Sequence, residues 1–157
     1  MTNLILSTID YCNILLLGAT KHDLRPLRLI INRALRFIYT IYFKNSITPY
    51  YHKAHFLPIA QRIQFKASLI AFKIYNHEAP TYFNSDFIKF VPTSNMELRA
   101  DCGRDAFMFK PHNDDINCRR LTSKIINNWN ALPLNIRQIT SRTLFKTKLK
   151  TFLFSNF

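Results

Sequence analysis

The chain has 157 residues and a formal net charge of +13, because 22 Lys and Arg outnumber 9 Asp and Glu. Its hydrophobic content of 48% suffices for a packed core and argues against wholesale disorder, and its length suits one domain, with or without an appendage. The 2 glycines, Gly18 and Gly103, are too few for a glycine-rich phosphate loop, so nucleotide sites of that type are excluded.

The first third of the chain predicts two helices. Residues 4–17 form an apolar run, and Gly18 is placed to end it in a left-handed conformation. Residues 23–43 predict an amphipathic helix with Pro26 in its first turn. Its apolar side is expected to comprise Leu27, Ile30, Ile31, Ala34, Phe37, Ile38 and Ile41. Its other side carries Leu29 and the four arginines Arg25, Arg28, Arg33 and Arg36.

The middle of the chain predicts a central helix. Thr48 as N-cap and Pro49 mark a short helix, and Pro58 begins a longer one over residues 58–76. Two apolar stripes run along the longer helix: Ile59, Ile63, Ala67, Ile70 and Ile74, and then Phe65, Leu69 and Phe72. A helix that is apolar on two sides is typical of the centre of a bundle. The line of Arg62, Lys66 and Lys73 between the stripes would emerge between its neighbours.

The rest of the chain predicts shorter elements. Residues 82–90 indicate a short helix, and residues 92–118 lack clear periodicity and indicate a long loop. Residues 121–129 indicate a helix, Pro133 a turn, and Ser141 the cap of a final helix that ends near residue 154. The final helix has an apolar stripe bordered by Lys146 and Lys150; the stripe comprises Phe145, Leu149, Phe152 and Leu153.

These elements predict an all-α protein, since no stretch of six or more residues alternates between apolar and polar. We expect a small helical bundle with a long irregular connector before two C-terminal helices. The bundle is expected over residues 1–91, a poorly ordered connector over residues 92–120, and a C-terminal helical segment over residues 121–157 that packs back on the bundle.

The positive charge indicates an acidic partner, which is nucleic acid or, less often, an anionic membrane. No acidic side chain follows Asp115, whereas basic residues continue to Lys150. The alternative is a solvated basic face that serves solubility. The N-terminal apolar run has no basic region before it and is interrupted by Asp10, so neither a signal peptide nor a membrane span is expected. We expect an intracellular protein, nuclear or cytoplasmic, with no membrane partner.

Few residues suggest catalysis. The adjacent Asp114 and Asp115 lie in a polar stretch that is typical of a turn rather than of a two-metal site. Cys102, His112 and Cys118 lack a fourth zinc ligand. The cysteines, including Cys12, are odd in number and widely spaced, which favours a reducing compartment. No metal, cofactor or catalytic residue is therefore expected. The 14 Phe, 7 Tyr and 1 Trp belong mainly to the core, and Tyr50, Tyr51 and Tyr82 are candidates for lining a groove.

Six phrases in succession carry a resemblance to a known family. They are STIDYCNILLLG, INRALRFI, ITPYYHKAHFLPIAQRIQFK, KIYNHEAPTYF, NNWNALPLNIR and FKTKLKTFLF. Together they resemble the C-terminal region of LINE-type (Jockey-like) non-LTR retrotransposon reverse transcriptases. The resemblance covers nearly the whole chain and weakens between about residues 91 and 121. The chain departs from the family where His77 and Glu78 replace a Gly-Leu-like pair.

The resemblance implies a post-palm segment of an RNA-directed DNA polymerase, that is, the thumb and the region beyond it. Such a segment holds template and primer, or target DNA. The family's aromatic-Ala-Asp-Asp catalytic hairpin is absent from the sequence, so the chain looks like a truncated fragment and no polymerase activity is expected from it alone. Upstream polymerase domains are possible partners.

We therefore expect a non-catalytic module that binds the nucleic-acid backbone non-specifically, with RNA or DNA left open. The expected contacts are Arg25, Arg28, Arg33, Arg36, Arg62, Lys66, Lys73, Lys146 and Lys150, with Lys148 beside the last two. The alternatives are a structural or interaction domain that completes a larger polymerase, and an inactive genomic relic with no selected role.

Overall fold

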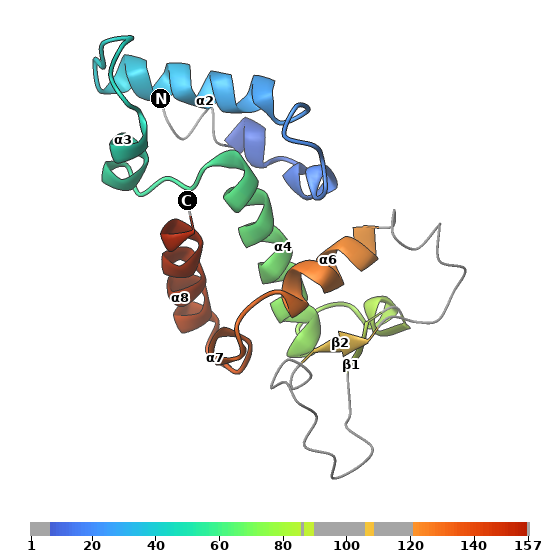
Figure 1. Ribbon diagram of the computed structural model, residues 1–157. Helices are drawn as coiled ribbons and strands as arrows, with labels where there is room; N and C mark the ends of the chain where they lie inside the picture. Colours follow the sequence, from blue (N-terminus) through green and yellow to red (C-terminus); the bar gives the residue numbers. More distant parts are fainter. Residues whose placement is uncertain (1–6, 86, 90–105, 109–120, 157) are drawn as a thin grey trace. The chain divides into compact units, whose positions relative to one another are not determined.

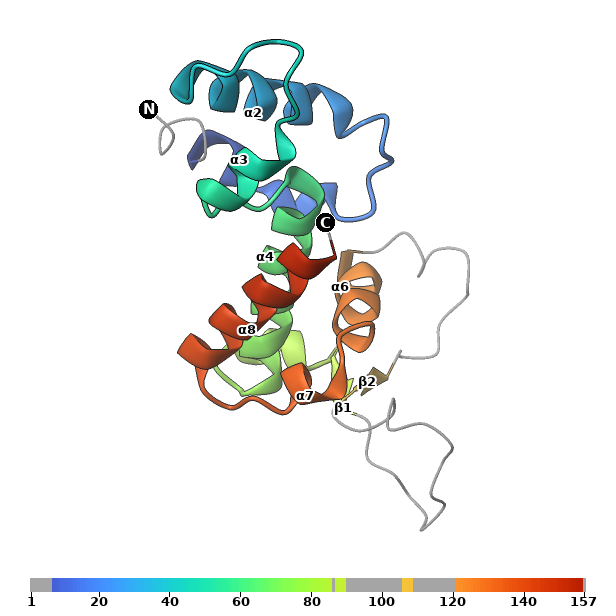
Figure 2. The same ribbon diagram turned by 60° about the vertical axis from the view of Figure 1, so that its left-hand side comes forward.

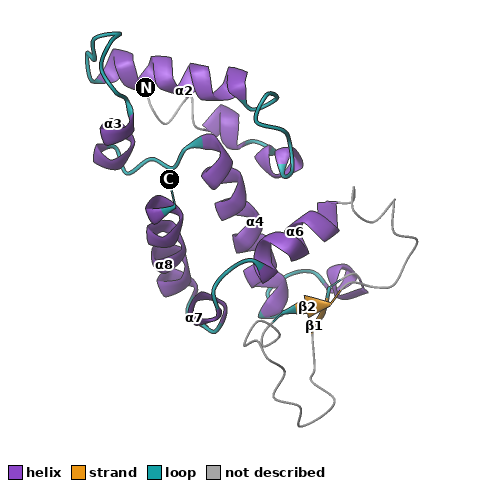
Figure 3. Ribbon diagram, in the orientation of Figure 1, coloured by secondary structure: helices purple, strands orange, loops and turns teal. Residues whose placement is uncertain are grey.

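A computed structural model of the chain describes residues 7–85, 87–89, 106–108 and 121–156 (Figure 1). These residues are mostly helical, which confirms the all-α prediction (Figure 3). They belong to two compact units. Unit 1 comprises Met1–Gln64 and Lys150–Phe157, and unit 2 comprises Phe65–Leu149. The expected boundaries near residues 91 and 120 stay predictions, because the adjoining residues lie outside the described part.

The elements of unit 1 come first in the chain. They are the 3-10 helix η1 (Asn13–Leu16), α2 (Arg25–Ile38), α3 (Thr48–Lys53) and the beginning of α4 (Ile59–Tyr75). Unit 2 continues α4 and adds η2 (Thr81–Ser85), β1 (Ile88–Lys89), β2 (Phe107–Met108), α6 (Leu121–Asn130), α7 (Leu134–Arg137) and α8 (Arg142–Ser155) as far as Leu149. The rest of α8, from Lys150 onward, belongs to unit 1.

The first predicted helix is interrupted. Residues 7–10 are helical, but Cys12 has a φ of 52° in the left-handed region, and the chain continues as the short helix η1. Gly18 has a φ of 85°, so the predicted left-handed glycine is confirmed. Asn13 is buried and donates a hydrogen bond from Nδ2 to Asp10 Oδ1 at 3.2 Å, which joins η1 to the preceding turn.

Among the described residues, three helices end on left-handed residues that are not glycine. Thr40, His55 and His77 follow α2, α3 and α4 with φ values of 50°, 51° and 58°. In each case the next residue donates its N–H to a carbonyl five residues back, as in a Schellman motif. Since L-residues are strained in this region, the low glycine content costs about 1–2 kcal/mol at each helix end.

The end of α2 differs from the prediction. The sequence predicted a helix to residue 43, whereas α2 ends at Ile38. Thr40 reverses the chain, and Ile41 donates its N–H to the Arg36 carbonyl at 3.0 Å while its side chain is buried. The burial of Ile41 fixes this reversal, because the apolar residue after the left-handed position packs back on the helix. Residues 42–45 therefore form a turn instead of continuing the helix.

The start of α2 is set by a polar turn. The Thr20 N–H and hydroxyl both donate to Asp23 Oδ2, at 3.0 and 2.7 Å, and the Asp23 N–H donates to Thr20 Oγ1 at 3.2 Å. The hydroxyl bond, followed by the backbone bond, lowers the pKa of Asp23 below its usual value. Pro26 then occupies the first turn of α2, as the sequence predicted. In α3, Thr48 is the first helical residue rather than the predicted N-cap, which is Ile47.

Unit 2 has an aromatic core. Phe72, Trp129 and Phe145 are fully buried, and the rings of Phe72 and Phe145 are stacked with centroids 4.4 Å apart. Trp129 stacks on Tyr75 at 5.5 Å, and Phe107 lies 5.9 Å from Trp129. These contacts join α4, α6, α8 and β2, so most of the aromatic content of this unit serves packing, as expected. In Figure 2, α6 runs beside the C-terminal half of α4.

Two polar side chains of α6 fix its position in unit 2. Asn128 Nδ2 donates to Ser68 Oγ of α4 at 2.8 Å. The Asn130 amide accepts from the N–H of Phe107 and donates to its carbonyl, both at 3.0 Å. Asn130 thus satisfies the backbone of β2 in the way that a neighbouring strand would.

Some predictions for unit 2 were wrong. The short helix predicted over residues 82–90 is η2 followed by β1, and β2 lies within the region predicted to be irregular. β1 and β2 pair antiparallel, with Ile88 opposite Met108 and Lys89 opposite Phe107. α6 and α8 confirm the two C-terminal helices, and Ile125 and Ile126 are buried as predicted. The short helix α7 follows Pro133, where the sequence predicted a turn.

The helix ends give a test by substitution at two histidines of the same segment. Replacing His55 by glycine is expected to stabilise the protein by about 1 kcal/mol, because glycine relieves the left-handed strain. His52→Gly, within the helical part of α3, is expected to destabilise it by about 1 kcal/mol. Urea unfolding measures both. Changes of the same sign in the free energy of unfolding of the two variants would contradict the assignment of His55 to a strained helix end.

Candidate nucleic-acid interface

The inner side of α2 is narrow and well fixed. Ile31 and Leu35 are its buried residues. Beside them, Asn32 Oδ1 accepts a hydrogen bond of 2.6 Å from the Tyr51 hydroxyl of α3. Burial raises the pKa of Tyr51 to about 12, and the positive charge of Arg28 acts in the opposite direction. The hydroxyl therefore stays protonated at neutral pH and can serve as the donor that joins α3 to α2.

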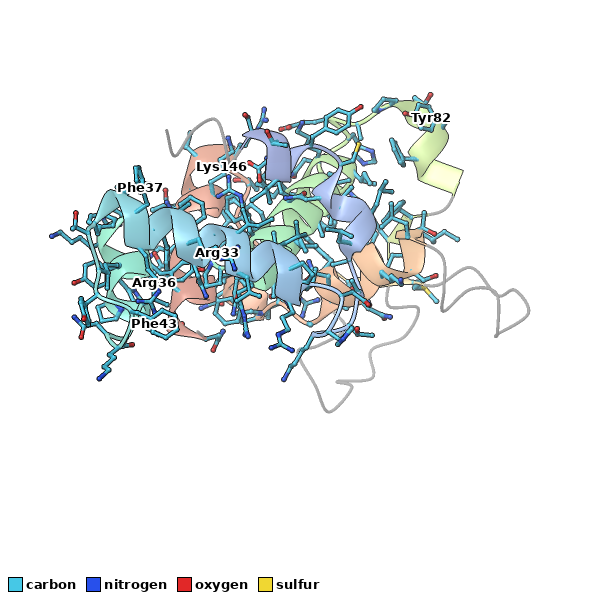
Figure 4. The ribbon with its side chains drawn as sticks, turned by 90° about the horizontal axis from the view of Figure 1, so that it is seen from above. Arg33, Arg36, Phe37, Phe43, Tyr82 and Lys146 are labelled. Atoms are coloured by element: carbon cyan, nitrogen blue, oxygen red, sulfur yellow. The ribbon has the colours of Figure 1, made fainter. Side chains whose placement is uncertain are left out.

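The outer side of α2 mixes arginines with apolar side chains. Successive helical residues turn by about 100°, so Arg25, Leu29, Arg33, Arg36 and Phe37 fall within an arc of about 120°. Arg25, Leu29 and Arg33 are exposed. Phe37 is 73% exposed. Figure 4, seen from above, shows Phe37 projecting from one edge of α2, and Arg36 with Phe43 at the opposite edge.

This face corrects the predicted apolar stripe of α2. Ile30, Phe37 and Ile38 were expected in the core, and all three are exposed. The reason is the narrow contact through Ile31 and Leu35, which lies on one flank of the predicted stripe and leaves its other flank in solvent. The prediction of outward-facing arginines agrees with the structure for Arg25, Arg28 and Arg33, which are exposed.

Arg36 has a structural task in the turn that follows α2. Its Nη1 donates to the Tyr42 carbonyl at 2.8 Å and its Nη2 to the Asn45 carbonyl at 3.2 Å. Its guanidinium lies 5.7 Å from the centre of the Phe43 ring. The turn is closed by a bond of 3.0 Å from the Asn45 N–H to the Tyr42 carbonyl. This turn therefore presents Tyr42, 73% exposed, and Phe43, 86% exposed, on a fixed backbone.

Unit 1 has a strong excess of positive charge. Its sequence contains nine Lys and Arg residues but two acidic residues, Asp10 and Asp23. Asp23 is bound to Thr20, and Asp10 forms a two-point ion pair with Arg62. Within the described part of the chain, no carboxylate pairs with the arginines of α2. Their charge is therefore available to an external anion.

The predicted line of cations on α4 is not a continuous basic surface. Arg62 is mostly buried, pairs with Asp10, and places its guanidinium 5.1 Å from the centre of the Phe56 ring. Asp10 neutralises the charge of Arg62 within the fold, and the predicted contact of Arg62 with nucleic acid stays a prediction. Lys66 and Lys73 are half-buried and belong to unit 2.

The predicted contacts on α8 fall in different surroundings. Lys146 and Lys148 are exposed in unit 2, whereas Lys150 is half-buried in unit 1. Lys150 Nζ lies 5.9 Å from the centre of the Phe154 ring. Of the nine predicted contacts, the structure thus groups the four arginines of α2, and the role of the others stays a prediction.

The aromatic predictions were partly wrong. Tyr51 was a candidate for groove lining but is 2% exposed, since its ring is part of the core of unit 1. Tyr50 is half-buried against Tyr39, with ring centroids 5.5 Å apart. Tyr82 is exposed, as predicted. The exposed rings of Phe37, Tyr42 and Phe43 were missed. The sequence did not indicate that the helix ends before them, because residues 41–43 include none of the polar residues that usually mark a turn.

Other chemistry finds little support in the described residues. In this part of the chain no group of three or more His, Cys, Asp and Glu side chains is placed to hold a metal ion. No helix among the described segments is long and apolar enough to cross a bilayer. Cys12 is a free, exposed thiol. The pair Asp114–Asp115 and the group Cys102, His112 and Cys118 lie outside the described residues.

The role assigned to Arg62 is testable by a double-mutant cycle with Asp10. Arg62→Gln is expected to destabilise the protein, because it leaves the Asp10 carboxylate without its main partner. The coupling free energy with Asp10→Asn, from urea unfolding of both single variants and the double variant, is expected to be about 1–3 kcal/mol. A coupling near zero would show that the pair does not hold unit 1 together.

Comparison with known proteins identified no relative of this chain. The chain matches no protein-family model, no curated protein and no solved structure.

Proposed function

We propose that this chain is a non-catalytic helical module that binds the phosphate backbone of nucleic acid through the arginines of α2. The observation that carries the proposal is the charge of unit 1, which contains nine basic residues and two acidic ones. Both acidic side chains have partners inside the fold. A polyanion is the partner that such an uncompensated surface attracts most strongly.

The arrangement of the arginines suits a phosphate chain. Arg25 and Arg33 are eight residues apart in α2, which corresponds to about 12 Å along the helix axis. That length matches about three to four phosphate steps along one strand of a duplex. Guanidinium groups bind phosphate oxygens through paired N–H donors, which gives orientation without sequence readout. The module would therefore hold a backbone rather than read its bases.

The polymerase context comes from the sequence resemblance. We propose that the chain corresponds to the region that follows the palm in LINE-type non-LTR retrotransposon reverse transcriptases. In that setting the arginine face of α2 would hold template and primer, or target DNA, while other parts of the enzyme carry out the chemistry. The exposed arginines of α2 support this role, because phosphate contacts position a nucleic-acid backbone without reading its sequence.

The salt dependence of binding tests the proposal. With three arginine contacts, from Arg25, Arg28 and Arg33, the logarithm of the affinity for a duplex of about 20 base pairs should fall with the logarithm of salt concentration at a slope of about −2.7. Arg25→Gln and Arg33→Gln should each weaken binding and flatten the slope by about 1, because each removes one released counterion. Fluorescence anisotropy at several salt concentrations measures affinity and slope together.

The matched control is Arg142→Gln, which removes the same charge from an exposed position of α8 outside the predicted contacts. It should leave the slope unchanged. A salt-independent affinity, or equal effects of Arg33→Gln and Arg142→Gln, would contradict backbone binding by α2.

A further inference from the structure

Three exposed rings lie close together in the sequence and within the most basic part of the fold. Phe37, Tyr42 and Phe43 are each more than two-thirds exposed, on α2 or on the turn after it. A ring that stays in water does not gain the free energy of about 1.5–3 kcal/mol that burial of such a side chain provides. Turns also favour small polar residues or glycine and proline over aromatic ones. Phosphate binding by arginines gives no reason for these rings.

The rings are held on fixed supports. Phe37 projects from the last turn of α2. Phe43 belongs to the turn that Arg36 joins to the helix through two carbonyls, and the buried Ile41 anchors the chain just before it. Arg36 also places its guanidinium over the Phe43 ring. A ring presented in this way loses little conformational freedom when another flat group stacks on it.

The surroundings of the rings decide which partner fits. The centres of protein interfaces are depleted in charged residues, whereas here Arg36 lies between Phe37 and Phe43, and Arg33 lies farther along α2 (Figure 4). A membrane-bound helix needs a continuous apolar face, whereas on the outer side of α2 the exposed Leu29 and Phe37 share one arc with three arginines. Cations interleaved with exposed flat rings match a nucleic-acid strand whose bases are unpaired.

We infer that Phe37 and Phe43 stack on unpaired bases while Arg25 and Arg33 bind the adjoining phosphates, so that unit 1 prefers single-stranded over duplex nucleic acid. This inference rests on the proposed backbone binding and adds a substrate class to it. Arg36 acts as a positioning residue, because its two carbonyl contacts hold the turn that presents Phe43.

The experiment separates bases from phosphates with three probes. These are a thymidine oligonucleotide of about 15 nucleotides, a strand of equal length with abasic sugars, and a duplex of equal length. The unmodified protein should bind the thymidine strand at least about fivefold more tightly than the abasic strand, which carries the same phosphates. Fluorescence anisotropy at one fixed salt concentration gives the three affinities.

Single substitutions show which rings contribute the part of the affinity that depends on the bases. Phe37→Ala and Phe43→Ala should each reduce affinity for the thymidine strand about fivefold or more and leave the abasic and duplex affinities unchanged. Tyr82→Ala is the matched control, because it removes an equally exposed ring from unit 2 and should change none of the three. Arg36→Lys keeps the charge but loses the paired donors, so it should lower thymidine affinity and preserve the salt slope.

The outcomes distinguish this inference from the proposed function. Equal affinities of the unmodified protein for thymidine and abasic strands would overturn base stacking and leave backbone binding intact. Equal losses from Phe43→Ala and Tyr82→Ala would overturn the assignment of the rings. Failure to bind any of the three probes would overturn the proposed function and this inference together.

Discussion

The burial of Ile31 and Leu35 fixes how α2 is rotated about its own axis. Both residues lie on one narrow side of the helix, and the hydrogen bond from Tyr51 to Asn32 holds the adjoining flank against α3. Since this contact uses a small part of the circumference, most other side chains of α2 face solvent. The arginines and Phe37 are exposed together for this reason, and the chemical character of unit 1 follows from that rotation.

A shortage of glycine shapes the surface next to this helix. α2 ends on Thr40, and the chain then turns through Tyr42 and Phe43, where glycine or polar residues are usual. Arg36 compensates by binding two carbonyls of the turn, which gives the aromatic pair a defined backbone. Arg36 thus contributes to the positive charge of α2 and also holds the turn that carries Tyr42 and Phe43.

Periodicity predicted the long helices well, because α4, α6 and α8 bury broad apolar stripes that dominate their sequence pattern. It failed at α2, where Phe37 and Ile38 continue the apolar period but are exposed. The ion pair of Asp10 with Arg62 spans 52 positions in the sequence, so no local pattern could reveal it. The short strand pair depends on Asn130 and on a partner segment far along the chain, and it was equally invisible to periodicity.

The candidate interface was predicted in part. Helical spacing placed the arginines of α2 on one outward side, since charge and periodicity are both local properties. It could not show that Arg62 is neutralised or that Tyr51 is buried, because these depend on tertiary contacts. The exposed rings were missed for a related reason. Periodicity alone assigns an apolar residue on the apolar side of a helix to the core, and only the neighbouring element shows whether that residue is covered.

The central claim is that the outer face of α2 is the surface that meets nucleic acid. Nuclear magnetic resonance of isotope-labelled protein, titrated with an oligonucleotide, tests it most directly by following each backbone amide. The account predicts that the largest shift changes fall in α2 and in the turn at residues 39–45, while amides of α6 and α7 stay in place. Largest changes in α6 and α7, or changes spread evenly over both units, would contradict it.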